Sequence, residues 1–84
     1  MTYEDLQEVV HRRPFEPFRL LISTGITFDI RHPDLIVVER RSAQVGVTRD
    51  PDGELYYRSV KIDLLHVVAI EELPTSGAGT NGSS

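Results

Sequence analysis

The sequence lacks cysteine and any long hydrophobic run, and each absence removes a class of protein. None of the 84 residues is a cysteine, which excludes a disulfide framework, a cysteine-based zinc site and thiol catalysis. No apolar run approaches the roughly 20 residues that a membrane-spanning helix needs. The first five residues are acidic and polar and do not form the apolar centre of a secretory signal. We therefore expect a cytoplasmic protein that makes no contact with a membrane.

Positive charge is also in short supply. Lysine and arginine number 9 against 13 aspartate and glutamate residues, which leaves a net charge of −4. Nucleic acid is polyanionic, so this balance disfavours an extended nucleic-acid contact. The chain is 39% hydrophobic and 26% charged, which is typical of a globular domain, and its length allows only one.

The composition changes near the end of the chain. Residues 74–84 read PTSGAGTNGSS and contain no charge and no large apolar side chain. Such a segment cannot bury enough surface to offset its conformational entropy. The sequence therefore predicts a single domain over residues 1–73 and a disordered tail rich in glycine, serine and threonine over 74–84.

A short helix is predicted at the start of the domain. Thr2 is a suitable N-cap, acidic residues crowd the first turn and basic residues crowd the last, as the helix dipole favours. Pro14 should end the helix. The helix is therefore predicted over residues 3–13, with one apolar stripe formed by Tyr3, Leu6, Val9 and Val10.

After Pro14 the hydrophobic period changes from helical spacing to two. Residues 18–22 and 26–30 alternate in polarity on either side of a Thr24-Gly25 turn, which predicts a hairpin with one buried face. Further short strands are predicted at 35–40, 44–48 with a bulge or bend at Gly46, 55–62 after a turn at 50–53, and 66–73 after a tight helical turn at 63–65. The expected fold is mostly β: a small SH3-like or Sm-like bent barrel of five or six short antiparallel strands with an N-terminal α-helix.

Two resemblances accompany this pattern. The segment RPFEPFR at 13–19, with Gly25 and the later RHPD at 31–34, resembles a group of small uncharacterised bacterial proteins with an RPFxPF segment and a later HPE or HPD. That group brings no known function.

The second resemblance is to the Sm-like (Hfq-type) family. A short helix before a bent sheet is similar to that family's order of elements, 21–26 resembles its first hairpin, and 66–74 resembles its closing strand. Leu65 and Asp29 stand where the family has a lysine and a glycine. The resemblance implies a ring-shaped oligomer that binds RNA.

No group of residues marks a metal, cofactor or catalytic site. His11, His32 and His66 are too far apart in the sequence to form a metal motif on one element. The acidic run at 50–54 lacks the glycine position and the downstream glutamate of a calcium loop. No serine lies in a nucleophile-elbow sequence. We therefore expect a protein that is not an enzyme and holds no cofactor.

Two apolar runs instead point to association. Residues 35–38, and residues 64–68 apart from His66, are apolar at successive positions, so the predicted strands need cover on both faces. One short helix covers only part of one face, and pairing of exposed strand edges with a second copy would supply the rest. The candidate interface residues are Leu35, Ile36, Val37, Val38, Leu64, Leu65, Val67 and Val68.

The sequence thus favours a non-catalytic, self-associating protein-interaction module, with a homo-oligomer or another protein as the partner. The alternative is an Sm-like oligomeric RNA-binding protein that uses basic and aromatic side chains. The candidate nucleic-acid contacts for that alternative are Arg12, Arg13, Arg19, Arg40, Arg41, Tyr56, Tyr57 and His66.

Overall fold

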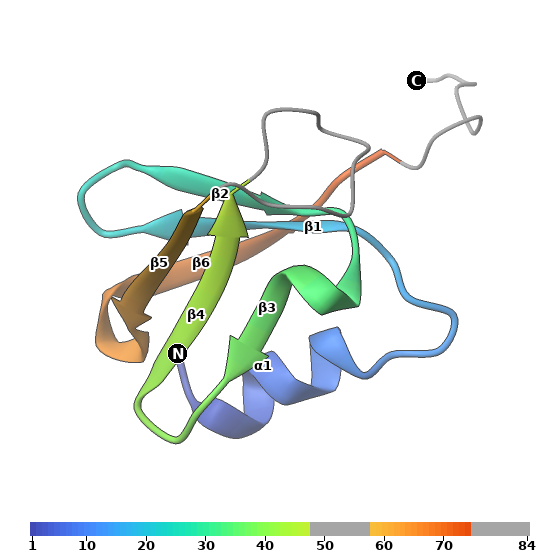
Figure 1. Cartoon of the computed structure of the whole chain (residues 1–84), viewed down its shortest axis with the longest axis horizontal. Coiled ribbons are helices and arrows are strands. Elements are labelled where there is room, and N and C mark those ends of the chain that lie inside the picture. Colours follow the sequence, from blue (N-terminus) through green and yellow to red (C-terminus); the bar gives the residue numbers. More distant parts are fainter. Residues whose placement is uncertain (48–57, 75–84) are drawn as a thin grey trace.

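The computed structural model describes residues 1–47 and 58–74 (Figure 1). Within these residues the chain forms six antiparallel strands in two three-stranded sheets and one helix at the N-terminus. The prediction of a mostly β fold with five or six short antiparallel strands and an N-terminal helix is confirmed. The strand orders are β2-β1-β6 and β3-β4-β5. The elements are α1 Tyr3–Val10, β1 Phe18–Ile22, β2 Thr27–Ile30, the 3-10 turn η1 Pro33–Leu35, β3 Ile36–Val38, β4 Ser42–Val47, β5 Arg58–Asp63, the 3-10 turn η2 Leu64–His66 and β6 Val67–Glu72.

Helix α1 begins where the sequence predicts and ends earlier. The Thr2 Oγ1 atom accepts a hydrogen bond from the backbone N–H of Asp5 at 3.1 Å, so Thr2 is the N-cap. Leu6 and Val10 are buried, which confirms the apolar stripe. The predicted end at residue 13 is wrong, because the helix stops at Val10. A residue before proline is disfavoured in helical geometry, and the chain has left the helix before it reaches Pro14.

The first sheet is built around β1. Phe18, Leu20 and Ile22 are buried while the residues between them are half-buried, which confirms the predicted alternation. Leu20 lies opposite Phe28 of β2 on one side and Ile70 of β6 on the other. These cross-strand partners place one apolar face of the sheet against the core.

A register shift in β6 decides which of its valines is exposed. Leu21 of β1 pairs with Ala69, but Ile22 pairs with Val67, so Val68 is an extra residue in the ladder. An extra residue in one strand reverses, relative to the partner strand, the face of the sheet on which its next side chains lie. Val67 is consequently buried and Val68 is exposed.

The second sheet is built around β4. Val45 lies between Ile36 of β3 and Val60 of β5, and its side chain is buried. The bulge expected at Gly46 is not seen, because Gly46 pairs with Ser59 in an unbroken register.

The bounds of β3 also differ from the prediction. The strand covers only Ile36–Val38, since Leu35 belongs to the 3-10 turn that starts at Pro33. The predicted turn at 50–53 and the first residues of the predicted 55–62 strand lie outside the described residues.

The core lies between the two sheets and the helix. Its largest fully buried side chains come from all three: Leu6 of α1, three residues of the first sheet and Val45 of the second. Figure 1 shows the strands of the two sheets running in crossing directions, with α1 beside β3. Within the described ranges, the single eight-residue helix is neither long nor apolar enough to cross a membrane.

Candidate functional site

Half of the predicted interface residues belong to the core. Leu35, Ile36, Leu64 and Val67 are between 2% and 5% exposed and therefore offer no surface to a second molecule in this conformation. Leu35 and Ile36 lie where η1 continues into β3, whereas Leu64 begins η2 and Val67 begins β6. The sequence pattern shows that both faces of these runs are apolar, but it does not show which members the chain covers itself.

The exposed members lie in two places. Leu65 of η2 is 83% exposed and Val68 of β6 is 58% exposed, and they are three residues apart in the chain. Val37 of β3 is also 58% exposed, but it lies on the outer face of the other sheet, opposite the polar Gln44. Val38 is half-buried against the core. Among the predicted interface residues, Leu65 and Val68 are therefore the two exposed side chains that lie close together in the chain.

Strand β6 also has an open backbone edge. It is the last strand in the order β2-β1-β6, and no strand among the described residues pairs with its far side. The N–H of Leu73 donates to the carbonyl of Pro17 at 3.1 Å, and hydrogen-bonded pairs alternate along an antiparallel ladder. The backbone groups of Ile70 and Glu72 therefore point away from β1. We call this open backbone edge, together with Leu65 and Val68, the β6 edge.

Several hydrogen bonds hold η2 in place beside this edge, among them one from the N–H of Ser23 to the carbonyl of His66 at 2.8 Å. The Asp63 Oδ1 atom accepts from the backbone N–H of Leu65 at 2.9 Å. The N–H of Leu64 donates to the carbonyl of Arg41 at 2.9 Å, and the Ser23 hydroxyl lies 3.2 Å from Nδ1 of His66. With its backbone tied on both sides, η2 buries Leu64 and exposes Leu65.

Two arginines predicted as nucleic-acid contacts are paired with carboxylates. The Arg19 Nε atom lies 2.7 Å from Oδ1 of Asp29, and its Nη1 atom lies 3.9 Å from Glu71. The hydrogen bond that Arg19 donates to Asp29, and the negative charge of Asp29, raise the pKa of Arg19 above the ordinary value. The Arg12 Nη1 atom lies 2.9 Å from Oε1 of Glu16. Both side chains therefore offer less net positive charge to a polyanion.

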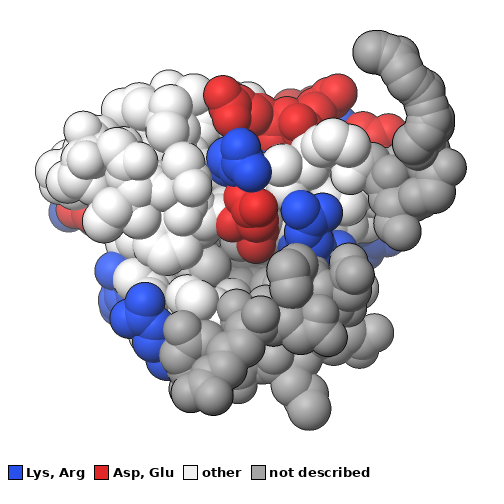
Figure 2. Space-filling view, turned by 90° about the horizontal axis from the view of Figure 1, so that it is seen from above, with Lys and Arg blue, Asp and Glu red and all other residues white. Residues whose placement is uncertain are grey.

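Arg13 and His66 do not extend Arg12 and Arg19 into a basic surface. Arg13 is exposed and donates to the carbonyl of Arg12 at 3.0 Å, and His66 lies beside Ser23. Tyr56 and Tyr57 are outside the described residues. Figure 2 shows acidic and basic side chains next to one another on the face it presents, rather than a wide basic area.

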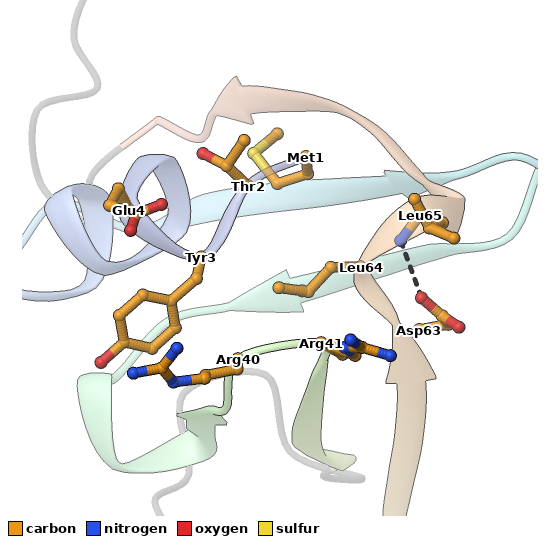
Figure 3. Close-up of a pocket in the computed structure, with 9 residues that line it drawn as sticks. All are labelled: Met1, Thr2, Tyr3, Glu4, Arg40, Arg41, Asp63, Leu64 and Leu65. Atoms are coloured by element: carbon orange, nitrogen blue, oxygen red, sulfur yellow. Dashed lines mark hydrogen bonds between the residues drawn. The ribbon is translucent and has the colours of Figure 1, made fainter.

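Arg40 and Arg41 line a pocket that the sequence does not predict. Its volume is about 750 Å³, and it lies between the start of α1, the connection from β3 to β4, and η2 (Figure 3). Three separate segments meet here, so linear spacing contains no sign of the pocket. The lining residues are Met1, Thr2, Tyr3, Glu4, Arg40, Arg41, Asp63, Leu64 and Leu65.

Histidine, aspartate and glutamate side chains do not gather into a group of three that could hold a metal ion anywhere in the part of the chain that the structure describes. Comparison of the chain with protein-family models, with curated proteins and with solved structures gives no match.

Proposed function

We propose that this chain is a non-catalytic module that associates with copies of itself through the β6 edge. The observation that carries the proposal is the exposure of Leu65 and Val68 beside a strand edge whose far side pairs with no strand of residues 1–47 and 58–74. An open edge is a template for a strand from another molecule, and the backbone bonds formed there need no particular side chains. A second copy offers the same edge, so two copies can pair β6 with β6 around a two-fold axis.

The size of the domain supports the proposal. A unit of this length buries only about 60% of the surface that its unfolded chain exposes. Its core is expected to supply only about 3–5 kcal/mol of stability. Burying the Leu65 and Val68 side chains against a second copy would stabilise the complex by about 1.5–3 kcal/mol for each side chain. We also propose that the two sheets form the bent SH3-like or Sm-like barrel expected from the sequence.

Light scattering after gel filtration, carried out over a range of protein concentrations, tests this function. The mass is expected to rise with concentration, and Val68→Lys is expected to weaken association about tenfold, which corresponds to about 1.4 kcal/mol. Val37→Lys is the matched control, because Val37 has the same exposure and the same substitution but lies on the other sheet. A monomer at high micromolar concentration would overturn the proposal, as would an effect of Val37→Lys equal to that of Val68→Lys.

Nuclease treatment separates this function from the RNA-binding alternative. The ion pairs of Arg12 and Arg19 count against that alternative. A self-associating module should keep its mass after treatment and show no nucleic-acid absorbance. If the oligomer falls apart with nuclease, and if RNA binds with an affinity that drops steeply as salt rises, the Sm-like alternative is the correct one.

A further inference from the structure

The arginines of this chain differ in how their charge is compensated. Arg12, Arg19 and Arg31 each have a nitrogen within 4.0 Å of a carboxylate oxygen. Arg40 and Arg41 have no such partner among residues 1–47 and 58–74, although they are adjacent in the chain and line the same pocket. The two guanidinium groups therefore lie beside a concave surface whose own carboxylates, those of Glu4 and Asp63, form no ion pair with them.

Most other polar groups around this pocket already have a partner within the chain. The Thr2 hydroxyl accepts from Asp5, and the Tyr3 hydroxyl accepts from the side-chain amide of Gln7 at 2.9 Å. The Asp63 carboxylate accepts from the N–H of Leu65. Glu4 also lines the pocket and lies in the first turn of α1, where the helix dipole favours its charge. The Thr2 and Tyr3 hydroxyls keep an O–H to donate, and the two guanidinium groups are the cationic side chains in this lining.

The rest of the lining is apolar or aromatic. Figure 3 shows the Arg40 side chain beside the Tyr3 ring, with the Leu64 side chain directed into the space between α1 and the arginines. Leu65 lies at the η2 side and is 83% exposed. A volume of about 750 Å³ falls within the range of about 300–1,000 Å³ that is usual for small-molecule sites.

We infer that this pocket binds a small organic oxyanion, a carboxylate or a phosphate monoester, whose apolar body covers Leu65. The guanidinium fork of arginine matches both oxyanions with two parallel hydrogen bonds. The Tyr3 ring and the exposed Leu65 side chain give the apolar body a surface that inorganic phosphate cannot use. The inference concerns a different surface from the β6 edge except for Leu65, and the two proposals can fail separately.

The backbone around the pocket is held independently of the arginine side chains. Leu64 donates to the Arg41 carbonyl, so replacing the Arg41 side chain leaves this hydrogen bond in place. A loss of binding in Arg41→Ala can therefore be separated from a loss of the pocket.

Nuclear magnetic resonance of the full-length, isotope-labelled chain tests the inference. The probes are phenyl phosphate, phenylacetate, inorganic phosphate and neutral benzyl alcohol. Phenyl phosphate or phenylacetate is expected to shift the amide signals of residues 1–4, 40–41 and 63–65, and to bind more tightly than inorganic phosphate or benzyl alcohol. Whichever of the two aromatic anions binds more tightly identifies the oxyanion. Arg41→Ala should weaken this binding about tenfold, as expected for a lost charged hydrogen bond.

Two control variants make the result specific. Arg13→Ala removes the same charge from an exposed arginine outside the pocket and should leave the affinity unchanged. Arg41→Lys keeps the charge but loses the fork, so its affinity should fall between those of the wild-type chain and Arg41→Ala. The dispersion of the amide spectrum shows whether each variant is folded.

Three results would overturn the inference. They are the absence of shifts at these residues with millimolar aromatic anions, an equal loss of affinity in Arg13→Ala, and binding of benzyl alcohol as tight as that of the anions. If only a single-stranded oligonucleotide binds, with a steep dependence on salt, the arginines serve nucleic acid and the small-ligand site is wrong.

Discussion

The backbone N–H of Leu64 donates to the carbonyl of Arg41 at 2.9 Å, and this bond joins the 3-10 turn η2 to the connection between β3 and β4. The contact links residues that are far apart in the sequence. It brings the arginines to the same pocket as the start of α1, and it holds η2 in the orientation that buries Leu64 and exposes Leu65. The candidate ligand pocket and the β6 edge therefore depend on the same short turn, which is the basis of the first prediction.

Replacing Asp63 with alanine should destabilise η2. The substitution leaves the N–H of Leu65 without its side-chain acceptor, which we expect to lower the free energy of unfolding by about 1 kcal/mol. Asp63→Asn keeps an acceptor oxygen at the same position and should cost less. Urea denaturation followed by circular dichroism measures both variants. Equal stabilities for wild type and Asp63→Ala would show that the hydrogen bond contributes nothing to the fold.

A side chain at position 25 should fit without a steric clash, but it should strain the backbone of that residue. Gly25 has a φ of +93°, and a Cβ atom built there meets nothing within 4 Å. Gly25→Ala is therefore expected to cost about 1–2 kcal/mol through backbone conformation alone. Gly25→Asn should cost less, because asparagine adopts positive φ more readily than alanine. The midpoints of thermal unfolding compare the three chains, and an alanine variant as stable as the asparagine variant would contradict the explanation.

Truncation of a core leucine and of an exposed leucine should have very different effects. Leu20 is 0% exposed, so Leu20→Ala should destabilise the fold by about 2–5 kcal/mol, most of the stability expected for a domain this small. Leu65 is 83% exposed, so Leu65→Ala should change the stability of the monomer by less than about 0.5 kcal/mol. Denaturation at a protein concentration low enough to keep the chain monomeric measures both. A large loss in Leu65→Ala under those conditions would place this side chain in the core instead of on the β6 edge.

Local patterns predicted the elements better than their ends. Thr2, the stripe through Leu6 and Val10, and the alternation from Phe18 to Ile22 depend on neighbours within a few residues, and each was predicted correctly. The early end of α1 was missed. Capping, proline geometry and the path to β1 together decide where that helix stops, and only the proline was visible in the pattern.

The candidate sites were harder to predict for a different reason. Successive apolar residues in 35–38 and 64–68 correctly indicated that both faces of these segments are apolar. They could not separate Val67 from Val68, because that difference comes from one extra residue in the pairing of β6 with β1. Likewise, the arginines at 12, 19, 40 and 41 look equivalent in the sequence. Their cross-strand and cross-turn neighbours make two of them ion-paired and leave the other two without a carboxylate partner among the described residues.

The sequence by itself determined the kind of most elements and the face that α1 and β1 turn to the core, because hydrophobic period, capping and turn chemistry act over a few residues. Only the tertiary structure decided which apolar side chains stay exposed and which charged groups lie together. Those outcomes depend on strand register and on contacts between distant segments, such as Leu64 with Arg41 and Arg19 with Asp29, and such contacts leave no mark on local spacing.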